Sequence, residues 1–253
     1  MDPMGDIAML SEEVLTALIL VFARIAAAVG LMPGFGSSLL PMRVRLAGAV
    51  AFTMIVWPMV PDTQGVPLLP GLLIEIAVGV ALGLSVRFLV MALQFAGSIA
   101  AQSTSLAQLL GPGAMPDPMP AIGALLSLAG VTLALVLGLH IRTAEALVLS
   151  YDLIPLGRLP VAGELAEWSI ARTGHAIALG FTLAAPFVVV ALAYNVALGA
   201  INRAMPQLMV AFIGAPAITG ASILMMLMAA PMLLYHWNDL LARVLSAPFS
   251  VLP

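Results

Sequence analysis

Long apolar runs constrain the fold of this chain more than any other feature of its sequence. Most of them approach the roughly 20 residues that an α-helix needs to cross the hydrocarbon core of a bilayer. Hydrophobic residues make up 62% of the chain, against roughly 45–50% in soluble domains, so we predict a membrane protein. The runs extend over Val14–Met32, Leu46–Val60, Leu72–Phe95, Ile122–Leu139, Ala176–Ala200 and Leu208–Leu234.

The runs predict helices rather than the strands of a membrane barrel. They lack the alternating polarity and the length of roughly 10 residues that barrel strands show, and a helix satisfies its own backbone hydrogen bonds in lipid. Stretches rich in proline and glycine, such as "WPMVPDTQGVPLLPG", separate the runs and predict turns. The expected fold is an all-α integral membrane protein with about six hydrophobic segments. We expect residues 1–253 to form a single membrane domain.

Charged residues are rare and scattered along the chain. The net charge is −3, every basic residue is arginine, and no basic run suggests contact with nucleic acid. Arg43 and Arg45 follow the first run, whereas the N-terminus is acidic, and this asymmetry predicts a cytoplasmic first loop and a retained first helix. Cysteine is absent from the sequence, which excludes disulfides and thiolate metal sites.

Catalytic motifs are missing from the sequence. His140, His175 and His236 stand alone, without the H-E-x-x-H spacing that sets two metal ligands on one helix face. There is no G-x-S-x-G elbow and no P-loop. We therefore expect no enzymatic activity, no cofactor and no metal.

Three charged residues lie inside the apolar runs, namely Arg24, Glu75 and Arg87. A charge at the bilayer centre costs about 2.5–3.5 kcal/mol on insertion scales, so such a side chain usually faces protein or water. Arg87 can equally extend its head group to the membrane interface, whereas the shorter Glu75 has less reach. Glu75 and Arg87 are predicted to serve structure or assembly.

Small residues spaced four apart predict close helix packing. Gly79 and Gly83 form G-x-x-x-G, Gly97 and Ala101 repeat the spacing, and Asn195 and Gly199 carry it again. Such spacing places small side chains on one helix face, where another backbone can approach. The contact is either inside this chain or with another subunit.

The stretch "NVALGAINRAMPQL", Asn195–Leu208, breaks the apolar sequence. Pro206 disfavours a helical residue before it, so the preceding helix should end or kink near Met205. Arg203 and Gln207 can then satisfy the carbonyls that the break leaves free. The hypothesis is a structural elbow against a neighbouring subunit, and the alternative is an ordinary cytoplasmic turn.

Two segments are predicted to lie at the membrane surface. "GRLPVAGELAEWSIARTGHA" combines Glu164 and Glu167 with Trp168, which favours an interfacial helix, although a solvated loop is the alternative. "HWNDLLARVLSAPFSVLP" carries an apolar stripe that begins at Trp237, and we expect it to anchor at the surface or to bind a partner.

Several of these stretches, in order from Arg24 to about Pro231, resemble the FliR family of the type III export gate. The most specific block is "AAPFVVVALAYNVALGAINRAMPQLMVAFIGAP", with N-x-x-L-G, then R-x-x-P-Q and I-G-x-P. "EIAVGVALGLSVRFLVMALQFAGSIAAQ" and "LGLHIRTAEALVLSYDLIPLG" also match. The sequence departs from the family after Ala101, where "QSTSLAQLL" replaces a Gly-rich, aromatic-containing segment.

The resemblance implies a subunit of the flagellar export gate in the bacterial inner membrane, within the basal body. It implies FliP-like, FliQ-like and FlhB-like partners, a central channel, and unfolded protein as the exported substrate. It also implies bent helical hairpins, many of them held by protein rather than by lipid.

By its position, "SLAQLLGPGAMPDPMP" matches the family segment thought to lie in the channel and help close it. Its glycines and prolines prevent a regular helix while its other residues stay apolar. The alternative is a re-entrant connector buried in the subunit. The residues expected to form this plug are Leu106, Leu109, Leu110, Gly111, Met115, Asp117, Pro118 and Met119.

Two other functions remain open at the level of sequence. An injectisome export gate subunit would share the architecture, and the residues separate it poorly from a flagellar one. A small-solute secondary transporter would also contain broken helices, but it should show related halves. No convincing internal repeat occurs in the sequence.

Overall fold

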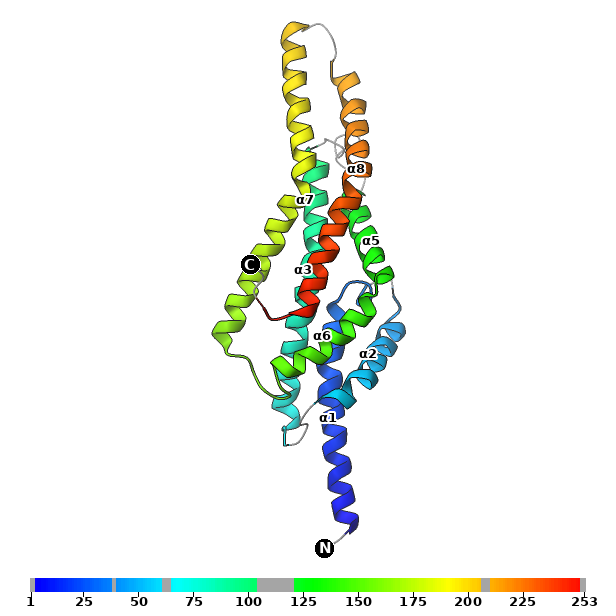
Figure 1. The fold of residues 1–253 in the computed structure, drawn as a ribbon, viewed down its shortest axis with the longest axis vertical. Coiled ribbons are helices and arrows are strands. Elements are labelled where there is room, and N and C mark those ends of the chain that lie inside the picture. The colour runs from blue at the N-terminus through cyan, green and yellow to red at the C-terminus, as the bar shows by residue number, and fades with distance from the viewer. Residues whose placement is uncertain (1–2, 38–39, 61–64, 104–120, 206–209, 251–253) are drawn as a thin grey trace. The chain divides into compact units, whose positions relative to one another are not determined.

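A computed structural model describes residues 3–37, 40–60, 65–103, 121–205 and 210–250 (Figure 1). Within these ranges the regular structure is helical and contains no strand. The elements are α1 (Pro3–Leu31), α2 (Met42–Val56), the short 3-10 helix η1 (Trp57–Met59), α3 (Leu68–Ser103), α5 (Ala121–Val136), α6 (Leu139–Leu153), α7 (Ala162–Ala204) and α8 (Val210–Ser246).

The helices account for the apolar runs of the sequence. Five of those in the described ranges are long and apolar enough to cross a membrane, and the broken pair α5 and α6 brings the number to six if it counts as one span. The break between them falls at Gly138, whose φ of 87° is a conformation that residues with a Cβ rarely adopt. The prediction of an all-α membrane protein with about six hydrophobic segments is confirmed.

The chain divides into two compact units, and each long helix from α3 onward contributes to both. Whether the whole sequence is one evolutionary domain stays a prediction. Unit 1 comprises residues 1–88, 134–173 and 240–253, and unit 2 comprises residues 89–133 and 174–239.

The core of unit 1 forms where α3 packs against α1. Gly79 and Gly83 of α3 face the α1 backbone, and a Cβ on Gly83 would lie 2.6 Å from the carbonyl oxygen of Ala28. The absence of a side chain at both positions lets the two backbones approach closely. Leu20 of α1 and Leu82 of α3 are fully buried in this unit.

Unit 2 is held by contacts of α3 with α5, α7 and α8. Gly97 of α3 and Gly123 of α5 lie so close that a Cβ on Gly97 would overlap the Gly123 backbone. The Phe95 and Phe181 rings meet edge to face with centroids 5.2 Å apart. The indole Nε1 of Trp237 donates to the carbonyl oxygen of Leu89 at 2.8 Å.

The chain covers the two segments that were expected at the membrane surface to different extents. The first one, with Trp168, forms the beginning of the 43-residue helix α7, and Trp168 is buried against Phe249 with ring centroids 5.8 Å apart. In the second, Trp237, Leu241 and Val244 are at most 1% exposed. The chain itself covers the C-terminal apolar stripe, so the prediction that this stripe anchors at the membrane surface is wrong. The first segment is not a separate short helix, but Ile170 in it is 74% exposed, and its place at the membrane surface stays a prediction.

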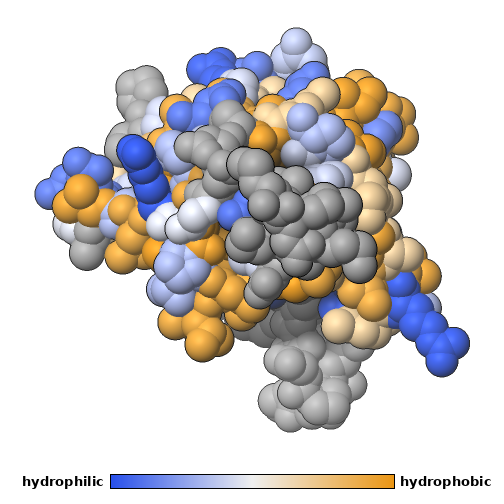
Figure 2. All heavy atoms as spheres, turned by 90° about the horizontal axis from the view of Figure 1, so that it is seen from below, coloured by the Kyte–Doolittle hydropathy of each residue, from blue (hydrophilic) through white to orange (hydrophobic). Residues whose placement is uncertain are grey.

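Many other apolar side chains face outward. Only 11% of the α8 segment Ala217–Ser246 is buried within the chain, against 56% of the α3 segment Leu68–Ser103. Figure 2 shows one face of the molecule on which hydrophobic residues occupy broad areas between smaller hydrophilic ones. Such surface is incompatible with a free soluble protein and requires lipid or other protein chains as cover.

Candidate functional site

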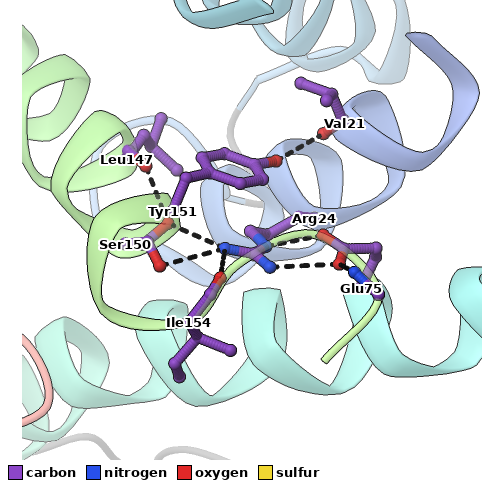
Figure 3. A network of polar contacts seen from close by, with 8 residues as sticks. Val21, Arg24, Glu75, Leu147, Ser150, Tyr151 and Ile154 are labelled. Atoms are coloured by element: carbon purple, nitrogen blue, oxygen red, sulfur yellow. Dashed lines mark hydrogen bonds and ion pairs between the residues drawn. The ribbon is translucent and has the colours of Figure 1, made fainter. Parts of the chain in front are cut away.

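A buried ion pair joins α1 to α3 in unit 1 (Figure 3). The Nε atom of Arg24 donates to Oε2 of Glu75 at 2.6 Å, and Nη2 donates to Oε1 at 3.0 Å. Both side chains have no exposed surface. Oε1 of Glu75 also accepts a hydrogen bond from the backbone N–H of Gly157 at 2.9 Å, so the carboxylate reaches the loop between α6 and α7.

The third nitrogen of Arg24 contacts the end of α6. Nη1 donates to the carbonyl oxygens of Ser150 and Ile154, at 3.1 and 2.9 Å, and to the Ser150 hydroxyl at 3.3 Å. The guanidinium lies 3.9 Å from the ring centroid of Tyr151, a cation–π contact. The Tyr151 hydroxyl in turn donates to the carbonyl oxygen of Val21 at 3.5 Å, back on α1.

The network is fully satisfied, which is the condition under which a buried charge pair is tolerated. Removing one partner of such a pair typically costs about 3–5 kcal/mol, because the other charge stays buried without compensation. Arg24 therefore fixes α1, α3, α6 and the loop after α6 in one arrangement. Its described contacts are hydrogen bonds, an ion pair and a cation–π contact that join these elements.

A second arginine holds the C-terminal end of α8 in unit 1. Nη2 of Arg172 on α7 donates to the carbonyl oxygens of Ala247, Pro248 and Ser250, at 3.3, 3.1 and 2.8 Å. The same guanidinium lies 5.8 Å from the Trp168 ring centroid. These carbonyls follow the last turn of α8, where no further helical N–H is available to them.

The charged residues expected in the membrane have different environments. Arg24 and Glu75 are buried and paired, whereas Arg87 is exposed. Sequence reasoning had no reason to select Ser150 or Tyr151, because neither carries a charge and both lie far from Arg24 in the sequence.

The small-residue pairs also differ from one another. Gly79 and Gly83 pack inside the chain, whereas Asn195 is exposed and a Cβ on Gly199 would meet nothing within 4 Å. The helix that contains Asn195 and Gly199 ends at Ala204, with the exposed Arg203 in its last turn.

Two groups of expected site residues lie outside the described ranges. Pro206 and Gln207 fall between α7 and α8. The proposed plug residues, 106–119, fall between α3 and α5. These two helices contact each other at Gly97 of α3 and Gly123 of α5. No group of three His, Asp or Glu residues able to hold a metal ion occurs in the part of the chain that the structure describes.

Comparison with known proteins finds one family along nearly the whole chain. The model of the family described as "Bacterial export proteins, family 1" matches residues 15–244. The flagellar biosynthetic protein FliR of Caulobacter vibrioides is 34% identical over 215 residues, which cover 81% of this chain and 85% of that protein. The FliR protein of Escherichia coli is 27% identical over 92% of this chain and 93% of its own length. The FliR protein of Aquifex aeolicus is 29% identical over 88% of this chain and 88% of its own length.

Proposed function

Because the chain belongs to family 1 of the bacterial export proteins, we propose that it is a membrane subunit of the flagellar protein export apparatus. The observation that carries the proposal is similarity to flagellar biosynthetic proteins along most of both chains. The helices long enough to cross a membrane agree with it. The subunit contributes to transport, and no catalytic step is assigned to it.

In finer detail, the subunit assembles with FliP-like and FliQ-like membrane proteins around a channel and contacts an FlhB-like export protein. Unfolded flagellar subunits pass through this channel across the bacterial inner membrane, within the basal body. The outward apolar side chains of α7 and α8 support an assembly, because Leu192, Val196 and Leu227 are each more than 60% exposed. Protein or lipid must cover them.

The segment 106–119 is proposed as the part of the subunit that closes the channel at rest. It is apolar yet rich in proline and glycine, and it joins helices that contact each other at Gly97 and Gly123. Apolar side chains can block a pore by excluding water from it. Deleting part of the segment should raise ion leakage through the assembled gate, and an unchanged conductance would argue against a plug.

The end of α7 is proposed as an assembly elbow. Arg203 is exposed in the last turn of α7, close to the negative end of the helix dipole, and Pro206 and Gln207 follow in the sequence. Asn195 and Gly199 lie on the same helix, where they offer a close approach to a partner, and the exposed Arg87 on α3 is a further candidate contact.

The test is gene deletion followed by complementation. Hook and filament subunits are measured in the culture medium and inside the cells. Loss of export with normal synthesis, restored by the gene on a plasmid, supports the proposal. Normal export in the deletion strain would overturn it.

A further inference from the structure

Pro186 interrupts the backbone hydrogen bonding of α7. It lies inside the helix rather than in its first turn, and a proline has no N–H to donate to the carbonyl four residues earlier. That carbonyl belongs to Thr182, and no side chain in the part of the chain that the structure describes donates to it. The carbonyl of Thr182 therefore lacks the donor that the neighbouring carbonyls of the helix have.

This acceptor lies far from water if α7 crosses the membrane. Thr182 is at the midpoint of Gly163–Ile201, a candidate span with a mean hydropathy of 2.3. The Thr182 side chain is exposed and does not pack into the core of unit 2. Lipid tails cannot donate a hydrogen bond, and proline is tolerated inside membrane helices because neighbouring helices, side chains or ordered water satisfy the freed carbonyl. The chain supplies no such group at Thr182, so the group has to come from outside it.

The chemistry of Thr182 defines what can cover it. Its hydroxyl donates to the carbonyl oxygen of Ala178 at 2.9 Å, so the hydroxyl hydrogen is already used. Thr182 then offers two oxygen acceptors, the hydroxyl and the backbone carbonyl, and no side-chain donor. A side chain with N–H or O–H groups complements these oxygens. A carboxylate would be repelled by them, and a lipid tail would leave them unpaired.

The surface around Thr182 allows another helix to come close. Ala178, Ala185, Val189 and Ala193 are all exposed. They lie three or four residues apart in series with Thr182, which places them on one face of α7. Small side chains on one face let the backbone of a second membrane helix approach. A donor on that helix can then reach the carbonyl oxygen of Thr182.

α8 also contains an internal proline, but its surroundings differ. Pro231 removes the donor for the carbonyl of Leu227 in the same way. Leu227 has no hydroxyl, and the exposed Leu224 and Met228 beside it are large. Large side chains keep the backbone of another helix farther away. Pro231 therefore provides a matched comparison for Pro186.

We propose that a helix of a partner membrane subunit packs on this face of α7 and donates a side-chain hydrogen bond to the carbonyl oxygen of Thr182. A side-chain amide suits the position best, because its two N–H groups can meet both oxygens of Thr182. The contact supplies the donor that Pro186 removes, so it forms only in the assembly. The identity of the partner rests on the proposed function, which makes it another subunit of the export apparatus.

The test compares two threonines of α7. Thr173 is exposed like Thr182 and donates to the carbonyl oxygen of Ser169 at 2.9 Å, but Ile177 supplies the N–H that the Thr173 carbonyl needs. The tagged full-length chain is purified from native membranes at increasing detergent concentrations, and the accompanying FliP-like and FliQ-like subunits are quantified. Thr182→Val removes one acceptor at nearly constant size and should lower their recovery about threefold or more. Thr173→Val should leave recovery unchanged.

Proline variants test the backbone carbonyl itself. Pro186→Ala restores an N–H to the carbonyl of Thr182, so it should strengthen the helix and yet lower the recovery of subunits. Pro231→Ala restores an N–H within α8 in the same way and should leave recovery unchanged. Pro186→Ala also straightens α7, whereas Thr182→Val keeps the proline, so a loss in both variants separates the hydrogen bond from the shape of the helix.

Photo-crosslinking identifies the molecule that covers this face. A diazirine-bearing amino acid replaces Val189, the membranes are irradiated before detergent is added, and the products are analysed by mass spectrometry. The expected product joins α7 to a helix of a different subunit. That helix should carry an N–H or O–H side chain within about two turns of the attachment point, because Thr182 lies about two turns from Val189.

Three results would overturn the proposal. Equal subunit recovery with Thr182→Val and Thr173→Val would exclude the hydrogen bond. Crosslinks to phospholipid alone would assign this face to the bilayer, and crosslinks to a second copy of the chain would assign it to a homodimer. Absence of FliP-like and FliQ-like subunits beside the unmodified chain would instead contradict the proposed function, and the crosslinked product would still decide what covers α7.

Discussion

Arg24 is the residue on which the contacts of unit 1 converge. All three of its side-chain nitrogens donate to buried acceptors on other elements, and its flat face lies against Tyr151. A lysine could supply the charge but not this fork of donors, because its ammonium is a compact point charge. The guanidinium geometry, and not charge alone, matches the site.

Removing the charge of either Arg24 or Glu75 should destabilise the chain. We expect Glu75→Gln to cost about 3–5 kcal/mol, because Arg24 then stays buried without a counter-charge. The measurement is thermal unfolding of the purified chain in detergent, with Arg87→Gln, a change at an exposed arginine, as the control. The double variant Arg24→Met with Glu75→Met should recover much of the loss, and no recovery would contradict the assignment of the cost to an unpaired charge.

The glycines of α3 offer a second test at residue scale. Gly79→Ala should destabilise the chain by about 1–3 kcal/mol, because the new methyl group would overlap the Arg24 carbonyl and the Ala27 side chain. Gly174→Ala on α7, where a Cβ meets nothing within 4 Å, should instead stabilise its helix by up to about 1 kcal/mol. The same unfolding assay compares them, and equal midpoints would refute the close approach of α3 to α1.

The sequence alone could not predict that Arg24 and Glu75 pair with each other. Burial costs identify Arg24 and Glu75 as residues that need protein around them. Their pairing joins α1 to α3, which are separated in the sequence by α2 and the short helix η1, and no local pattern encodes that contact. For Gly79 the spacing predicted a packed face, but only the structure shows that the face meets α1.

The helices themselves follow from hydrophobic patterning, whereas their ends do not. Most of each apolar run that the structure describes is helical, because its length and its backbone requirements in lipid leave few alternatives, although the run Ile122–Leu139 breaks at Gly138. α7 begins well before its apolar run, with Trp168 and Arg172 in an otherwise polar segment. The burial of these two side chains depends on the C-terminal residues that pack against them, and composition does not predict that contact.

Arg172 makes a testable link between α7 and the end of α8. Arg172→Gln should release the turn at 247–250, because a shorter neutral side chain cannot cap its three carbonyl groups. Hydrogen exchange should then speed up in this turn while α1 and α3 keep their protection. Arg203→Gln, at an exposed position on the same helix, should leave the turn unchanged. Faster exchange throughout unit 1 would mean that Arg172 supports the whole unit.

At the scale of the whole molecule, many large apolar side chains among the described residues are exposed. Leu192 and Val196 on α7 and Met228 and Met232 on α8 are all more than 60% exposed. Sequence hydropathy predicts that these residues avoid water, but it does not separate lipid-facing positions from those that another subunit covers. Lipid-facing and subunit-facing positions can be told apart by enlarging a small side chain, because a larger one prevents close contact with another helix.

Gly199 is the position for that experiment, because it is exposed and a Cβ there meets nothing in the chain. Gly199→Leu should therefore leave the isolated chain folded, with a thermal midpoint no lower than that of the unmodified protein. If a partner helix packs closely there, the leucine should reduce the amount of accompanying subunits in pull-downs from native membranes, and Gly199→Ala should reduce it less. Lipid would accommodate either side chain, so undiminished recovery of partners with both variants would assign this face of α7 to the bilayer.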